Sequence, residues 1–214
     1  MDRTRLGALV WASILQYFVM LLVVRSAWTL PFDPLVNAIS DLGAAECGEF
    51  NSRQVCSPWH DWANISWVLT GAALAGGALL LRPAFGRTRT ATVGTILLVA
   101  SGIGEIGVGL HPEDVSAWHL PSALVAIGCG LPGILLLGWS LRRTPGRRAI
   151  GWTGVGLGTV GLVAAVLIAV PAAPFGLVER LAAYPILLWA LCCGVVMLRR
   201  PARQPDTPQD TPYG

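Results

Sequence analysis

The chain has 214 residues, of which 54% are hydrophobic and only 13% are charged, and its mean hydropathy is +0.61. Soluble domains of this size are far more polar, so the composition excludes that class and predicts an integral membrane protein. The formal net charge is only +3, and the arginines fall in short separate clusters. This pattern excludes the basic face that nucleic-acid binding requires.

Six apolar runs are long enough to cross a bilayer core, which takes about 20 residues per helix. Backbone in lipid must satisfy its own hydrogen bonds, so each run is predicted to be a helix. We expect an all-α bundle, one domain over residues 1–200, and a disordered cytoplasmic tail over 201–214. The predicted spans are at about residues 6–28, 59–81, 90–110, 117–141, 149–170 and 175–198.

The first run follows Arg3 and Arg5, as the apolar part of a signal peptide does. It is too long for one, and no small-residue cleavage site precedes the polar loop that follows it. We therefore expect a retained helix.

Arginines predict how the chain is oriented. They cluster before the first span, at 82–89, at 142–148 and after residue 198, which are all on one side of a six-span arrangement. The positive-inside rule makes that side the cytoplasm, so both termini are expected there. All 15 basic residues are arginine, which fits a GC-rich bacterial genome. For a bacterial multi-pass protein, the expected location is the plasma membrane. The 29–58 loop, the turn before the fourth span and the 171–174 turn are then extracytoplasmic.

The outer loop carries two features. Pro31 to Gly43 reads PFDPLVNAISDLG, in which apolar residues at helical spacing suggest a short re-entrant or interfacial helix that Gly43 ends. Its Asn, Ser and Asp residues suit a surface turn equally well. Further on, Cys47 and Cys56 lie in a compartment that favours oxidation, so we predict a disulfide between them.

Polar residues gather at the outer ends of the spans. His60 and Asn64 are four residues apart on the second span and share a face. Glu105 lies about one turn and a half inside the third span, and Arg180 at a similar depth in the sixth, so an ion pair between them is expected, with Glu179 as the competing partner. The glycines at 102, 104, 107 and 109 leave one side of the third span without side chains. Either a neighbouring helix packs closely against that side or a lipid chain lies in it.

The stretch GLHPEDVSAWH, from Gly109 to His119, places two histidines and two acids between the third and fourth spans. Asp114 or Ser116 can cap the fourth helix while Pro112 enforces the turn. The tryptophans lie mostly near the two predicted boundaries, as in an aromatic belt, with Trp139 and Trp152 at the inner one.

Four segments resemble, in order and spacing, a family of bacterial and archaeal membrane proteins catalogued as domain of unknown function 998. They are NAISDLG at 37–43, CSPWHDWANIS at 56–66, GVGLHPEDVSAWH at 107–119 and GLVER at 176–180. The resemblance implies a six-helix membrane protein and brings no activity with it. It also implies that this chain's polar residues match recurrent family positions: Asn37, Ser40, Asp41, Asn64, Pro112, Glu113, Asp114, His119 and Arg180.

Several chemistries are open at this outer patch. His60, His111 and His119 could ligate zinc, whose catalytic sites take three protein ligands and a water. Without metal, His119 could act as a general base or acid beside Asp41 or Asp114, with Ser40 as nucleophile. Glu105 or Asp41 could instead start the cyclisation of an isoprenoid as an acid. The non-catalytic alternative is a site that binds lipid or serves as a scaffold or docking surface for a protein partner.

We therefore expect an outer-leaflet polar site that binds a lipid or other amphipathic substrate, with its processing by a hydrolase left open. No nucleotide-binding loop is present, and the sequence names no protein partner. The candidate catalytic residues are Ser40, Asp41, Asp114 and His119, and the candidate substrate-binding residues are Asn37, His60, Asn64, Glu105, Glu113 and Arg180.

Overall fold

The computed structural model describes residues 2–170 and 172–199, and in it six helices are long and apolar enough to cross a membrane. This confirms the predicted all-α six-helix fold. The predicted tail at 201–214 lies outside the described residues. The first span consists of α1 (Arg3–Ala12) and α2 (Leu15–Ser26), and the others are α3 (His60–Leu81), α4 (Arg89–Leu110), α5 (His119–Leu141), α6 (Arg148–Leu167) and α7 (Phe175–Leu198).

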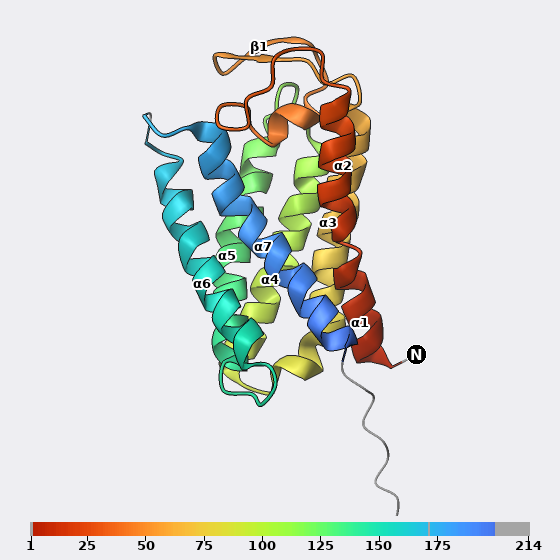
Figure 1. Ribbon diagram of the computed structural model, residues 1–214, viewed down its shortest axis with the longest axis vertical. Helices are drawn as coiled ribbons and strands as arrows, with labels where there is room; N and C mark the ends of the chain where they lie inside the picture. The colour runs from red at the N-terminus through yellow and green to blue at the C-terminus, as the bar shows by residue number, and fades with distance from the viewer. Residues whose placement is uncertain (1, 171, 200–214) are drawn as a thin grey trace, which may run out of the picture.

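The helices form one bundle in which each span packs against its neighbours in the sequence and α7 also packs against α1 (Figure 1). Three tryptophans lie in its core: Trp11, Trp67 and Trp189 are at most 2% exposed. The aromatic belt therefore accounts for fewer tryptophans than the sequence indicated. The indole N–H groups of Trp11 and Trp189 remain hydrogen-bonded inside the core, because they donate to the backbone carbonyls of Leu74 and Ile150.

The N-terminus and the two short connectors, which include the turn η2 (Arg82–Phe85), lie at one end of the bundle (Figure 1). The long 27–59 loop lies at the other end, where it covers the tops of the helices. It holds the turn η1 (Ser40–Gly43) and the strands β1 (Gly48–Phe50) and β2 (Arg53–Val55). The strands pair antiparallel, with Gly48 opposite Val55.

The hairpin was not predicted from the sequence. Asn51 and Ser52 form its turn with φ values of 46° and 60°, the left-handed pair of backbone conformations that a tight two-residue hairpin needs. The predicted disulfide is confirmed, since Cys47 and Cys56 are joined across the base of the hairpin.

The expected helix over Pro31 to Gly43 is wrong except for two isolated turns, one at Asp33–Asn37 and η1. Between them the carboxylate of Asp41 accepts from the N–H of Ala38 at 2.9 Å and so occupies a backbone donor that a continuous helix would use. Such local side-chain bonds compete with helix formation. The segment is nonetheless well buried from Asn37 to Gly43, so it is an ordered plug and not a surface turn.

The glycines of α4 allow close helix packing, as one of the two alternatives predicted. They serve two neighbours: a Cβ on Gly102 would lie 2.5 Å from the carbonyl oxygen of Gly71 on α3, and one on Gly104 would lie 2.5 Å from the amide of Ala126 on α5. Gly109 approaches Asn64 of α3 equally closely. These contacts hold the three helices near enough for the outer site to form between them.

Gly102→Ala should therefore lower the free energy of unfolding by about 1–3 kcal/mol, the usual cost of overpacking. Gly76→Ala on α3 is the matched control, because nothing lies within 4 Å of its added methyl group. Thermal unfolding in detergent measures both variants. Equal midpoints for the two would contradict the close α3–α4 contact.

Candidate functional site

A buried ion pair between Asp41 and Arg53 lies at the centre of the outer loop. Nε and Nη2 of Arg53 donate to the two carboxylate oxygens of Asp41 at 2.7–3.0 Å, and the Asp41 side chain is fully buried. Asn37 Nδ2 and the N–H of Ala38 donate to the same carboxylate. Asp41 is thus fully hydrogen-bonded and neutralised, which suits a structural anchor better than the catalytic role predicted for it.

Ser40 lies between two further acids. Its Oγ donates to Oε2 of Glu113 at 2.8 Å and lies 3.4 Å from Oε1 of Glu179, while the backbone N–H of Ile39 donates to Oε2 of Glu179. Glu113 comes from the turn before α5, and Glu179 from the first turns of α7. Three segments far apart in the sequence therefore meet at η1.

Glu113 is short of partners. Its side chain is 9% exposed, and its Oε1 accepts no hydrogen bond from any described residue, although Nη2 of Arg53 lies 3.6 Å away. Burial, with the hydrogen bonding and negative charge of Asp41, raises the pKa of Glu113 against the weaker opposing effects of Ser40 and Arg53. Arg53 lowers the pKa of Glu113 only weakly, because its charge is already neutralised by Asp41 at the shorter distance of 2.7 Å. Glu113 therefore holds its proton well above the ordinary carboxyl range.

The turn around Pro112 is tied to the loop by Asp114. Its carboxylate accepts from the backbone N–H groups of Ala45 and Glu46 at 3.0 and 2.7 Å. These bonds occupy both carboxylate oxygens and fix the loop against the start of α5. Asp114 therefore acts as an anchor for the loop.

The three histidines predicted as zinc ligands are each held by other partners. Nδ1 of His60 contacts the carbonyl of Ser57 at 3.0 Å, Nδ1 of His119 contacts the carbonyl of His111 at 2.7 Å, and Nδ1 of His111 contacts Oγ of Ser116. In residues 2–170 and 172–199, no group of three His, Cys, Asp or Glu side chains converges as a metal site. The zinc expectation is not supported by this geometry.

Asn64 joins α3 to the end of η1. Its Nδ2 donates to the carbonyl of Gly43 at 2.9 Å, and Gly43 itself lies so close to the ring of Trp67 that a side chain there would collide with it. His60 and Asn64, which were predicted to share a face of the second span, thus bind the loop at the backbone carbonyls of Ser57 and Gly43.

The expected ion pair between Glu105 and Arg180 is wrong among the described residues. Nη1 of Arg180 donates instead to the carbonyls of Pro34, Asn37 and Gly176 at 2.6–2.9 Å. Gly176 lets the loop approach, because a Cβ there would strike the carbonyl of Asn37. Backbone carbonyls thus satisfy the guanidinium, and equal depth in two helices did not bring the two side chains together.

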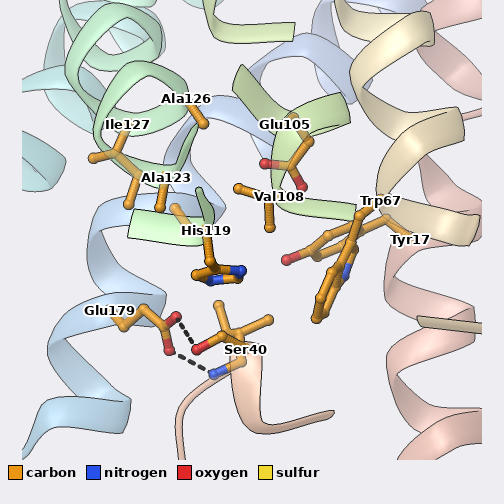
Figure 2. A pocket seen from close by; sticks show the side chains of 12 residues that line it. Tyr17, Ser40, Trp67, Glu105, Val108, His119, Ala123, Ala126, Ile127 and Glu179 are labelled. Carbon is orange, nitrogen blue, oxygen red and sulfur yellow. Dashed lines mark hydrogen bonds between the residues drawn. The ribbon is translucent and has the colours of Figure 1, made fainter. Parts of the chain in front are cut away.

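Glu105 lines a small inner chamber of about 50 Å³ below η1, together with Tyr17, Ser40, Trp67, His119 and Glu179. Figure 2 shows the His119 ring between Glu105 on one side and, on the other, the hydrogen bonds that Glu179 accepts from Ser40 Oγ and from the N–H of Ile39. This volume admits a few water molecules.

A larger groove of about 530 Å³ begins at the same polar residues. Ser40, Arg53, Glu113, His119 and Glu179 line its upper end. The apolar remainder of its wall belongs to the outer halves of α5, α6 and α7 and includes Leu120, Leu124, Ile127, Ala165, Ile168 and Phe175. Leu120 and Leu124 are about two-thirds exposed, so the groove opens on the face of the bundle that the spans present to lipid.

The family comparison matches almost the whole of this architecture. A family model described as "Protein of unknown function (DUF998)" covers residues 10–196, from the first span to the end of the last. The chain belongs to the DUF998 family. No curated protein and no solved structure matches it.

In this DUF998 chain the predicted site residues divide into two groups. Ser40, Glu113 and His119 line the groove, and Glu105 lines the chamber beneath it. The others hold the loop in place: Asn37, Asp41, His60, Asn64, Asp114 and Arg180. Sequence reasoning missed Arg53 and did not include Glu179 in the site, although a carboxylate just inside the sixth span was a signal for the latter.

Removing one member of the buried pair should destabilise this DUF998 protein strongly. Arg53→Gln leaves the Asp41 carboxylate without its cation, which typically costs about 3–5 kcal/mol in a buried pair. The double variant Asp41→Asn, Arg53→Gln should lose much less than the sum of the single variants. Unfolding in detergent measures this cycle, with Arg87→Gln on the exposed 82–88 connector as a neutral control; strictly additive effects would contradict the pair.

The raised pKa of Glu113 predicts a pH dependence. A carboxyl group whose pKa is higher in the folded state stabilises the fold below its unfolded pKa, about 4.3, and loses that contribution as pH rises towards the folded value. Glu113→Gln stays neutral, so its stability relative to wild type should improve steadily from pH 5 to pH 8, by at most about 1.4 kcal/mol per pH unit. Unfolding midpoints across this range test the expectation, and a constant difference would refute it.

Proposed function

We propose that this DUF998 protein binds an amphipathic molecule, with the polar head in the outer site and the apolar part in the groove. The observation that carries this proposal is the continuity of the groove, whose lining includes two acids, Arg53 and His119 at the loop and leucine, isoleucine and alanine side chains farther along the helices. A membrane lipid has the same division. The groove also opens on the lipid-facing surface, so a ligand could enter from the bilayer without crossing water.

We further propose that the site faces the outside of a bacterial plasma membrane and that both termini are cytoplasmic. The arginine-rich connectors at 82–89 and 142–148 lie at the end of the bundle opposite the site (Figure 1). Positive loops are retained in the cytoplasm. The Cys47–Cys56 bond at the site's end agrees, because disulfides persist in extracytoplasmic compartments.

Binding is favoured over hydrolysis by the way Ser40 is used. Its hydroxyl donates to Glu113, and within the described ranges no hydrogen bond joins it to His119. The base of a serine nucleophile has to reach that hydroxyl and be free to take its proton. Glu113 reaches it, but its raised pKa keeps it protonated, and Glu179 lies farther away at 3.4 Å and already accepts from the N–H of Ile39. The carboxylates of the other two acid candidates are already hydrogen-bonded: that of Asp41 accepts from Arg53, and that of Asp114 accepts from backbone amides.

Cyclisation of an isoprenoid is disfavoured by size. The chamber at Glu105 does have aromatic walls, from Tyr17 and Trp67, but its volume of about 50 Å³ suits a few waters and not a polyene chain. The groove, which is large enough, does not include Glu105 in its lining.

Filling the groove should release the ligand. Ala165→Phe places an aromatic ring in the groove wall, and we expect at least a tenfold loss of one defined amphiphile that co-purifies with wild type. Val163→Phe is the matched control, because Val163 lies on the same helix, is 58% exposed and does not line the groove.

Mass spectrometry of solvent extracts measures this binding. Wild type and Val163→Phe should carry the same amphiphile above the level of bulk membrane lipid. The proposal fails if wild type carries only the bulk mixture, or if both variants lose the amphiphile equally.

A further inference from the structure

A second pocket, of about 720 Å³, lies at the opposite end of the bundle from the outer site, where α5 connects to α6. Its wall consists of Arg142, Arg143 and Arg148, the turn between them, and two tryptophans, Trp139 and Trp152. It shares no residue with the outer groove, so it is not part of the binding site described above.

Two indoles form the side of this pocket that faces the membrane. Trp139 near the end of α5 and Trp152 near the start of α6 are 45% and 49% exposed, and their rings meet edge to face at 6.5 Å. The guanidinium of Arg142 lies 3.3 Å from the centre of the Trp139 ring. Half-exposed tryptophans beside arginines are typical of the depth at which lipid headgroups lie.

The pocket has an uncompensated positive charge. Arg143 and Arg148 are exposed, and neither makes an ion pair or a side-chain hydrogen bond in the part of the chain that the structure describes. The 142–148 segment contains no acid. Arg147 is different, because it donates to the carbonyl of Ala84 in the turn η2 and does not line the pocket.

We propose that this pocket binds the phosphate headgroup of an anionic phospholipid of the inner leaflet. Arg143 and Arg148 would contact the phosphate, since guanidinium groups match phosphate oxygens in charge and geometry. The half-exposed Trp139 and Trp152 would lie along the glycerol and the first acyl carbons. The aromatic wall at the ends of two spans favours a lipid over free phosphate, because a soluble anion would gain nothing from it.

Native mass spectrometry of the full-length protein with added phosphatidylglycerol tests this site. The double variant Arg143→Gln, Arg148→Gln should bind it about tenfold more weakly than wild type, since each arginine near an anionic headgroup contributes substantially to affinity. The matched control is Arg87→Gln, Arg89→Gln, which removes the same charge from the neighbouring connector, outside the pocket. The control should bind phosphatidylglycerol as wild type does.

Two further arms make the result specific. Phosphatidylcholine, whose headgroup has no net charge, should bind all three proteins equally weakly, and excess inorganic phosphate should leave bound phosphatidylglycerol in place. Equal losses in the two double variants, or no loss in either, would overturn the proposal, and displacement by phosphate would overturn the assignment to a lipid. Thermal midpoints should match throughout, because all four arginines are exposed.

Discussion

The ion pair of Asp41 with Arg53 is the interaction on which the outer half of the molecule depends. It joins η1 to the hairpin, and the Cys47–Cys56 bond closes the hairpin at its base, so Arg53 is held from both directions. A buried pair of this kind adds little net stability compared with apolar packing. Its effect is to fix one arrangement of the loop, whose apolar residues Ile39 and Leu42 pack into the core of the bundle.

That arrangement determines the chemistry around it. Asp41 neutralises Arg53, so Glu113 and Glu179 depend on other donors. Both lie within hydrogen-bond distance of the Ser40 hydroxyl, and Glu179 also accepts from the amide of Ile39. Glu113 therefore keeps its proton, and the head of the groove combines donors and acceptors with little net charge. Such a surface suits a polar headgroup that forms several hydrogen bonds. The inner pocket at Arg143 and Arg148 has the opposite character, so the two ends of one bundle would select different ligands.

The sequence predicts the fold well because lipid permits few alternatives. The length and hydropathy of the apolar runs were enough for the six spans, and two cysteines nine residues apart in one loop were enough for the disulfide. The site was predicted less well, for a physical reason. Ser40, Glu113 and His119 were found because they belong to polar motifs that gather at one end of the predicted spans and that resemble the family's motifs. Arg53 was missed because a charged residue in a polar loop looks ordinary until a hairpin turns it towards Asp41.

The wrong predictions share one cause. Equal depth placed Glu105 beside Arg180, and a common side of the membrane placed three histidines together, but neither argument included the backbone. In the structure, backbone carbonyls accept from Nη1 of Arg180, and among the described residues the three histidines do not converge as a metal site. Likewise, the helical spacing in the 31–43 segment did not anticipate that Asp41 accepts from the amide of Ala38, which a continuous helix would need.

The most direct test of the account is photo-crosslinking in native membranes. A photoreactive amino acid in place of Leu124, in the groove wall, is compared with one in place of Ile96, which is 61% exposed on α4 and lines neither cavity at the outer end. The account predicts that position 124 captures one defined amphiphile and position 96 captures the bulk lipid mixture. The same bulk mixture at both positions would contradict a selective groove.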